Sequence, residues 1–168
     1  KVVAYEPRRI LFQLLCANLV LNGITNVDAV PSAIGSSAAS FREAHLPLHA
    51  GGNAGGHAIG ELAGDDEAFS MVTLDSQSLH WGKVALIKID VEGNELDVLK
   101  GAEKLIARDR PLLYLENDRP DKSRELLDHV ASLEYVIHWH WPRLYRPDNF
   151  WKNPQNIFGE TGSVNVLC

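Results

Sequence analysis

Three ionisable residues alternate with apolar ones in the run Ile87-Lys88-Ile89-Asp90-Val91-Glu92. Because side chains alternate between the two faces of a strand, Lys88, Asp90 and Glu92 are predicted to share one face. A carboxylate at the carboxyl end of a buried strand can receive the proton of a substrate hydroxyl or bind a cationic ligand. The structural alternative is helix capping, since Gly93 allows a tight turn and acidic residues stabilise the start of a helix.

Glu116 ends the next predicted strand along the chain, residues 112–116. If the two strands are adjacent and parallel, Asp90 and Glu116 lie close enough to share a proton or to hold a divalent ion. Strand-end carboxylates are also often just solvated, and we predict no metal site. A metal-dependent hydrolase that uses Asp90 and Glu116 is the weaker alternative, because no histidine-rich ligand set accompanies them.

The chain contains seven histidines, which raises the question of a metal site or a general base. His45 and His49 flank Pro47, which prevents a shared helical face, and His138 and His140 have no third ligand nearby in sequence. His138 is nevertheless a candidate general base, because it is predicted to end a strand and imidazole titrates near neutrality.

Glu6 holds the corresponding position at the end of the opening strand. A carboxylate there can accept two hydrogen bonds from a ribose diol, as in nucleotide-binding folds. The glycine cluster at residues 51–56 does not form a phosphate-binding loop, because it lacks the Lys-Ser or Lys-Thr pair and no strong strand precedes it. A GxGxxG fingerprint is absent as well.

Strands and helices are predicted to alternate along the chain. Apolar runs and turn residues predict strands at 2–5, 26–34, 69–74, 84–91, 112–116, 135–139 and 164–167, and helices at 8–22, 94–107 and 121–133. The helix at 8–22 is expected to be largely buried and to end at Gly23, and Pro31 is expected to put the end of its strand at an edge or a bulge. The pattern indicates an α/β fold with a mostly parallel, doubly wound sheet.

Length and composition predict one domain spanning residues 1–168, with a long mobile Gly/Ala/His-rich insertion at about 35–67. Acidic residues outnumber basic ones by 22 to 16, which argues against nucleic-acid binding. The longest apolar stretch is too short and too polar to cross a bilayer, so no membrane association is expected. With only Cys16 and Cys168, the chain has no disulfide framework and is expected in a reducing, cytoplasmic compartment.

Several segments between Val3 and about Glu116 form a distinctive combination. They are Val3-Ala4-Tyr5-Glu6-Pro7, Asn18 with Asn22, Ala33-Ile34-Gly35, Thr73-Leu74-Asp75, Ile87-Lys88-Ile89-Asp90-Val91-Glu92-Gly93-Asn94-Glu95, Val98-Leu99-Lys100-Gly101-Ala102, and Pro111 with Glu116. Together they resemble the FkbM family of S-adenosylmethionine-dependent methyltransferases. The resemblance implies a Rossmann-like class I methyltransferase fold with S-adenosylmethionine lying across the strand ends.

In that arrangement Glu6 would bind the cofactor ribose, Ser32 and Ala33 would lie near the adenine, and Asp90 would face the methionine end and the acceptor. The reaction implied is methylation of a hydroxyl on a sugar or secondary metabolite, so the partner is a small molecule. An in-line displacement at the methyl group needs a proton acceptor for the hydroxyl. The candidates, in falling order, are Asp90, Glu92, Glu116 and His138. The insertion at 35–67 and the aromatic loop at 139–151 are expected to shape the acceptor pocket.

The sequence departs from the family pattern at its start. The family's first strand and its glycine-rich Asp-Val-Gly-Ala-Asn loop should come just before Val2, whereas this sequence opens at Lys1. We therefore expect an amino-terminally truncated domain and weak or no cofactor binding by these 168 residues alone. The alternative is a non-enzymatic remnant or partner-binding module that has lost the cofactor loop.

Overall fold

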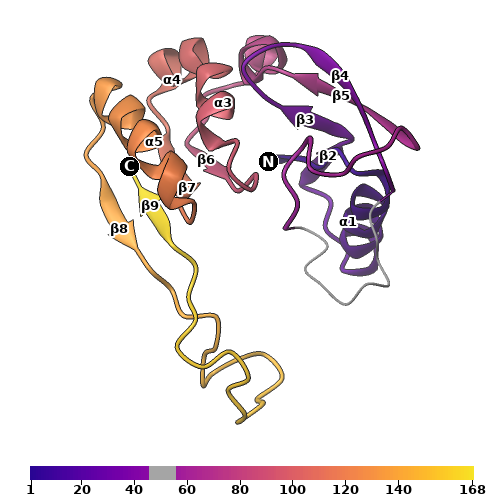
Figure 1. Cartoon of the computed structure of the whole chain (residues 1–168), viewed down its shortest axis with the longest axis vertical. Helices are drawn as coiled ribbons and strands as arrows, with labels where there is room; N and C mark the ends of the chain where they lie inside the picture. Colours follow the sequence, from indigo (N-terminus) through magenta and orange to yellow (C-terminus); the bar gives the residue numbers. More distant parts are fainter. Residues whose placement is uncertain (46–55) are drawn as a thin grey trace. The chain divides into compact units, whose positions relative to one another are not determined.

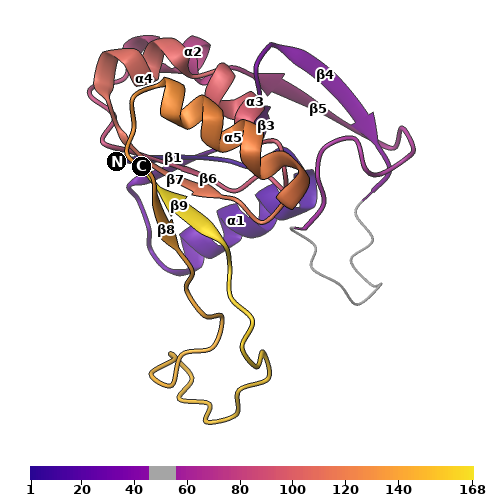
Figure 2. The same cartoon turned by 60° about the vertical axis from the view of Figure 1, so that its left-hand side comes forward.

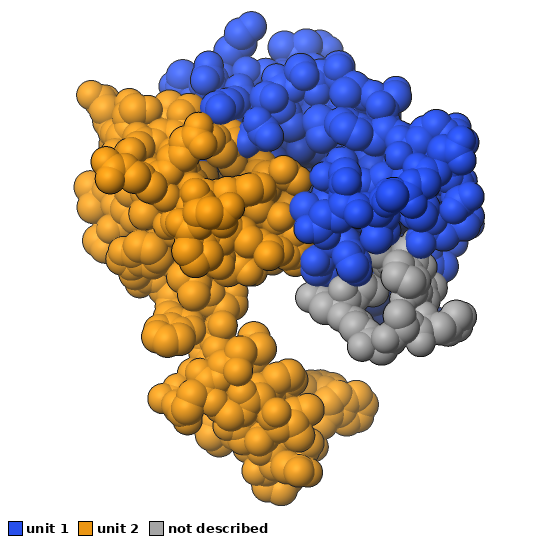
Figure 3. Space-filling view, viewed as in Figure 1, with its two compact units in different colours: residues 1–83, 97–109 blue, residues 84–96, 110–168 orange. Residues whose placement is uncertain are grey.

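A computed structural model of the chain describes residues 1–45 and 56–168 (Figure 1). They form two compact units, coloured separately in Figure 3: unit 1 contains residues 1–83 and 97–109, and unit 2 contains residues 84–96 and 110–168. The prediction of one domain with an insertion at 35–67 stays a prediction. The middle of that insertion, with His49 and most of the 51–56 glycine cluster, lies outside the described residues.

Unit 1 begins with a strand, a helix and a second strand, as predicted. β1 (Val2–Tyr5) pairs in parallel with β2 (Val27–Val30), and α1 (Arg9–Leu21) connects them. Gly23 has a positive φ of 62°, which glycine adopts without steric cost. Its N–H donates to the carbonyl of Val20 while the N–H of Ile24 donates to that of Leu19, the two bonds of a Schellman motif. Gly23 therefore ends the helix as expected.

The predicted burial of α1 is wrong. None of its residues is buried, and Val20 and Leu21 are 79% and 83% exposed. Apolar spacing predicts which side of a helix can be buried, but burial also needs a surface that covers that side. Within unit 1, α1 connects strands of a two-stranded sheet, which is too small to cover an entire helix.

Pro31 divides the predicted strand at 26–34 into two strands of different sheets. It separates β2 from β3 (Ser32–Ile34), which pairs in parallel with β5 (Glu67–Val72), and β5 pairs on its other side with β4 (Ala39–Glu43) in antiparallel orientation. Proline has no N–H to continue a ladder of hydrogen bonds, so the strand breaks there. The expected edge position is confirmed, since β3 is an edge strand of this three-stranded sheet.

The predicted helix at 94–107 is in fact two helices, α3 (Glu95–Lys100) and α4 (Glu103–Asp109). The break lies at Gly101, where an added Cβ would overlap the backbone carbonyl of Gly35. The Asp75 carboxylate then caps α4, because it accepts hydrogen bonds from the N–H groups of Lys104 (3.1 Å) and Leu105 (2.9 Å). A close contact between distant segments has therefore overridden a continuous helical pattern.

Asp75 belongs to a short helical stretch that sequence reasoning missed. It consists of α2 (Leu74–Gln77) followed by the 3-10 helix η1 (Ser78–His80). Thr73 caps α2, its Oγ1 accepting a hydrogen bond from the N–H of Ser76 at 3.1 Å. Elements this short carry too few residues for a periodic signal.

Unit 2 contains a four-stranded sheet in the order β6 (Leu86–Ile89), β7 (Leu112–Glu116), β9 (Asn165–Leu167) and β8 (His138–His140). β6 and β7 are parallel, while β9 runs antiparallel to both β7 and β8. α5 (Pro120–Ser132) lies against one face of the sheet, as Figure 2 shows. The side chains of that face and of the helix form the core, with Leu113, Leu115, Val130 and Val166 fully buried.

The opposite face of the sheet is less covered within unit 2. Leu86 and Leu112, which pair across β6 and β7, are 55% and 56% exposed. The predicted strand at 84–91 is thus shorter and less buried than expected. Between β8 and β9 the chain forms an extended arm (Figures 1 and 2), on which Phe150 and Trp151 are largely exposed. The expectation that this aromatic loop shapes an acceptor pocket stays a prediction.

The α/β fold class is confirmed, but a mostly parallel doubly wound sheet is not. Among the described residues the pairings β1–β2, β3–β5 and β6–β7 are parallel, and β4–β5, β7–β9 and β8–β9 are antiparallel. Helical crossovers impose parallel pairing only where they connect neighbouring strands. α5 connects β7 to β8, which are not neighbours in the sheet, and no helix precedes β4 or β9 directly. No helix in the described ranges is long and apolar enough to cross a membrane.

Candidate functional site

Three carboxylates meet at one end of the sheet in unit 2, and we call Asp90, Glu92 and Glu116 the carboxylate triad. β6 ends at Ile89 and β7 at Glu116, and the parallel register pairs Ile89 with Leu115, so Asp90 and Glu116 follow at the same edge. One oxygen atom from each of the three carboxylates lies within 4.8 Å of the others. The expectation that Asp90 and Glu116 lie near each other is confirmed.

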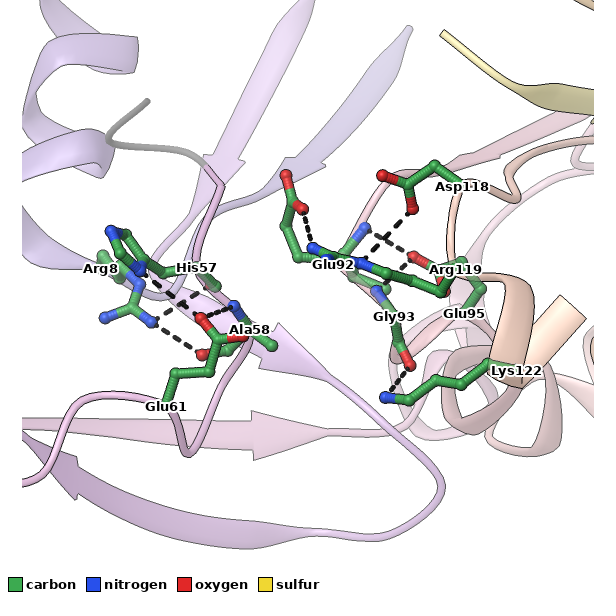
Figure 4. Close-up of polar contacts among 11 residues, drawn as sticks. Arg8, His57, Ala58, Glu61, Glu92, Gly93, Glu95, Asp118, Arg119 and Lys122 are labelled. Atoms are coloured by element: carbon green, nitrogen blue, oxygen red, sulfur yellow. Dashed lines mark hydrogen bonds and ion pairs between the residues drawn. The ribbon is translucent and has the colours of Figure 1, made fainter. Parts of the chain in front are cut away.

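Two members of the triad are paired with cations. Lys88 Nζ donates to Asp90 Oδ2 at 2.6 Å, which confirms that these two side chains share a face of β6. Arg119 Nη2 donates to Glu92 Oε2 at 2.8 Å (Figure 4). Sequence reasoning missed Arg119, which lies far along the chain from Glu92 and precedes α5.

Glu92 reaches the triad through a turn and does not continue the strand. Its φ is 56°, in the left-handed region, so the alternation that was expected to align it with Lys88 and Asp90 ends before it. The carboxylate of Glu95 accepts the N–H of Gly93 at 2.9 Å, and Lys122 Nζ donates to the Gly93 carbonyl at 2.8 Å (Figure 4). These bonds hold the turn in place.

Glu116 differs from the other two because it has no cationic partner among the residues that the structure describes. Its Oε2 atom is buried and has no hydrogen-bond partner among the described residues. Burial, followed by the negative charges of Asp90 and Asp118, raises the pKa of Glu116 to about 7. Burial also raises the pKa of Glu92, although Arg119 opposes that shift. The raised pKa of Glu116 therefore lies near neutral pH.

The predicted position of His138 is wrong. His138 begins β8 and does not end a strand, and it pairs with Leu167, while His140 is the residue at the register of Asn165 and Glu116. β8 starts later than predicted, because its pairing with the short strand β9 begins only at His138. Tyr135 lies outside it, and its hydroxyl donates to the Pro111 carbonyl at 2.7 Å. A role for His138 as a base stays a prediction.

In unit 1, Glu6 follows β1 directly. Its N–H donates to the Val30 carbonyl, and its Oε1 accepts the N–H of Arg8 at 2.8 Å. Its Oε2 has no recorded partner in the described ranges. Burial raises the pKa of Glu6, against the lowering effect of Arg8. A half-buried carboxylate with a free oxygen at the end of a strand fits the recognition of a ribose diol.

Ser32 and Ala33 are both buried in β3. The Ser32 hydroxyl donates to the Ser70 carbonyl at 2.9 Å, so it is engaged within the sheet. Their predicted place near an adenine is untested, and any such contact would involve the backbone of β3 more than the Ser32 hydroxyl.

A buried ion pair in unit 1 also escaped sequence reasoning. Arg8 Nη1 lies 2.9 Å from Glu43 Oε2, with the two side chains only 6% and 3% exposed. Next to them, the carboxylate of Glu67 accepts the N–H of Arg9 and lies 3.5 Å from His45 Nδ1. In the sequence, the only feature that could have indicated this ion pair is Arg8-Arg9 after Glu6-Pro7. Two arginines there are equally typical of the exposed first turn of a helix.

Comparison with known proteins identifies the family. The model of the methyltransferase FkbM domain matches residues 1–138. The chain belongs to this family. No curated protein matches the chain.

A solved structure agrees in fold. The crystal structure of the methyltransferase FkbM from Methylobacillus flagellatus KT superimposes with a TM-score of 0.64 at 18% sequence identity. The match covers 100% of this chain and 36% of that chain, so the present chain spans about a third of the length of that FkbM protein. At this identity the likeness concerns the fold alone. The family match confirms the resemblance of the motifs from Val3 to about Glu116.

Proposed function

We propose that this FkbM domain takes part in S-adenosylmethionine-dependent methyl transfer to a hydroxyl group of a small molecule, such as a sugar or secondary metabolite. The observation that carries the proposal is the position and pKa of Glu116. It lies at the end of a parallel strand, beside Asp90, and its pKa of about 7 matches a general base that works near neutral pH. Family membership supports methyl transfer as the reaction class.

The residues present fit parts of the cofactor. Glu6 offers a free carboxylate oxygen to the ribose hydroxyls, and its other oxygen is held by the N–H of Arg8. Ser32 and Ala33 are proposed to lie near the adenine, and Asp90 to face the methionine end. The bound cofactor would supply a methyl group on a positively charged sulfur, a good leaving group.

The role proposed for the carboxylate triad is to bind and deprotonate the acceptor. Transfer of the methyl group that the bound cofactor would supply requires the acceptor hydroxyl to be held in line and to lose its proton. The hydroxyl proton passes to Glu116, whose Oε2 has no other partner in the described part of the chain. Lys88 and Arg119 already pair with Asp90 and Glu92, so oxygen atoms of these two carboxylates are engaged before an acceptor arrives.

Cofactor binding tests the proposal. The full-length protein that contains this domain is titrated with S-adenosylhomocysteine by isothermal calorimetry. The variants Glu6→Gln and Glu103→Gln are titrated in the same way. Glu6→Gln is expected to weaken binding about tenfold, the effect of one charge-assisted hydrogen bond. Glu103→Gln is the matched control, because Glu103 is an exposed glutamate of α4. Absence of binding by the unaltered protein would contradict the proposal and favour a partner-binding module.

The remaining expectations are also proposals. Both cysteines are free, which supports a reducing, cytoplasmic compartment. The net charge of -6 supports a small-molecule acceptor over a nucleic acid.

A further inference from the structure

The Arg8 side chain connects three segments of unit 1. Its Nη1 pairs with Glu43 at the end of β4, and its Nη2 donates to the carbonyls of His57 (3.3 Å) and Ala58 (3.2 Å), as Figure 4 shows for the last two. Its backbone N–H donates to Glu6 Oε1 at 2.8 Å. Arg8 thus contacts Glu6, which is proposed to bind the ribose, and also β4 and the loop at residues 57–61.

Burial explains why this position holds an arginine. The planar guanidinium can donate to a carboxylate and to two carbonyls at once, whereas a lysine ammonium is a compact charge with shorter reach. A buried charge must be paired and hydrogen-bonded. For Arg8, Glu43 supplies the ion pair, and the carbonyls of His57 and Ala58 supply the hydrogen bonds. Glu43 gains a second contact from the same loop, since its Oε1 accepts the N–H of Gly60.

Within the loop at residues 57–61, Glu61 makes contacts with His57 and Ala58. His57 Nδ1 lies 3.4 Å from Glu61 Oε2, and that oxygen also accepts the N–H of Ala58 at 3.0 Å (Figure 4). The loop at 57–61 is therefore fixed at His57 and Ala58 by Arg8, at Gly60 by Glu43 and internally by Glu61. All of these contacts lie within unit 1.

We propose that Arg8 is a positioning residue of the cofactor site. Its backbone N–H holds the Glu6 carboxylate. Its side chain, through Glu43 and the carbonyls of His57 and Ala58, fixes that backbone and anchors the loop at 57–61. This inference rests on the proposed function, because Glu6 is the group through which Arg8 acts on the cofactor. Loss of the Arg8 contacts affects binding of the cofactor more than the chemical step, which takes place at the methyl group and not at the ribose.

The test compares Arg8→Lys with Arg110→Lys in the protein as the cell makes it. Arg110 is the matched control because it likewise donates to two carbonyls, those of Leu133 and Glu134, but in unit 2. Arg8→Lys is expected to raise the KM for S-adenosylmethionine about tenfold, as for one lost charge-assisted contact, with kcat nearly unchanged. It is also expected to speed amide hydrogen exchange in residues 57–61. Arg110→Lys changes neither measurement.

A second variant covers the case in which Arg8→Lys does not fold. The double change Arg8→Met with Glu43→Gln removes both buried charges together, so no unpaired ion remains. It is expected to show the same rise in KM and the same faster exchange. An unchanged KM overturns the proposal even if the loop loosens, because Arg8 then acts on the fold alone.

The two proposals fail in different ways. If the unaltered protein binds no S-adenosylhomocysteine, the proposed function fails, and hydrogen exchange alone decides the role of Arg8. Faster exchange at 57–61 in the Arg8 variants then still supports the anchoring of the loop. Unchanged exchange overturns it.

Discussion

Glu116 lies beside Asp90 at the carboxyl ends of two parallel strands, and the two carboxylates do not share a cation. Lys88 pairs with Asp90, while the buried Oε2 of Glu116 has no hydrogen-bond partner in the described part of the chain. Burial of Glu116 and, after it, the negative charge of Asp90 raise the pKa of Glu116 to about 7. This relationship is the basis of the first three predictions below.

Replacing Glu116 by Gln is expected to lower kcat for methyl transfer by about 10²- to 10⁴-fold, the usual contribution of a general base. In the unaltered enzyme the rate should rise as the pH increases through about 7, because only the ionised carboxylate accepts a proton. Glu116→Gln should lose that rise. Rates measured from pH 5 to 9 check this, with Glu125→Gln on the exposed side of α5 as the control. A Glu116→Gln enzyme of normal rate would assign the proton to another residue.

Stability should also depend on Glu116. Its pKa is about 7 in the folded state, against an ordinary value of 4.5, so between these values the folded state binds more protons than the unfolded state. The contribution is complete below pH 4.5 and is lost as the pH rises through about 7. We expect the loss to be on the order of 1–2 kcal/mol, because solvent screens a partly exposed carboxylate. Urea unfolding at pH 5 and pH 8 measures it.

Glu116→Gln is the comparison that isolates this effect, since its side chain does not titrate. The free energy of unfolding should fall less between pH 5 and pH 8 in Glu116→Gln than in the unaltered protein. Equal pH dependence in the two proteins would show that the pKa of Glu116 is not raised by folding.

Removal of divalent metals is expected to leave methyl transfer unchanged. Although the oxygens of the carboxylate triad lie within 4.8 Å of one another, Lys88 and Arg119 already pair with two of its members. A divalent ion would have to compete with both cations for the same oxygens. Rates before and after dialysis against EDTA test this expectation. Activity lost on dialysis and restored by Mg²⁺ would instead identify the triad as a metal site.

Gly101→Ala is expected to destabilise the protein by about 1–3 kcal/mol, because its Cβ would overlap the carbonyl oxygen of Gly35 and the backbone would have to shift. Gly82→Ala is the control, since an added Cβ there meets no atom within 4 Å. Urea unfolding of both variants measures the difference. If the two lose equally little stability, the contact between Gly101 and Gly35 does not determine the break between α3 and α4.

Much of the local structure was predictable. The bounds of β1 and β7 agree with the sequence-based prediction, and α1 and α5 agree to within a residue at each end. The prediction was also confirmed where one residue decides where an element ends. Gly23 ends α1, and Pro31 separates β2 from the edge strand β3. The nearness of Asp90 and Glu116 followed from two adjacent parallel strands, although β6 is shorter than predicted.

Other features depended on contacts between distant residues. The helical pattern at 94–107 is continuous in sequence, but Gly35 approaches it at Gly101 and divides it. The apolar spacing of α1 predicted a buried helix, yet none of its residues is buried. Tyr135 was predicted to start a strand, but the pairing with β9 begins at His138, and the Tyr135 hydroxyl instead donates to the Pro111 carbonyl.

The amino-acid sequence by itself determined where most helices and strands form and which of them end in carboxylates, because backbone preference and side-chain spacing are properties of neighbouring residues. Tertiary structure alone decided the pKa of Glu116, the pairing of Glu92 with Arg119 and the buried contact of Arg8 with Glu43. Each depends on burial and on distances between residues far apart in the chain. The charge state of a carboxyl group follows from those through-space quantities and not from its neighbours in sequence.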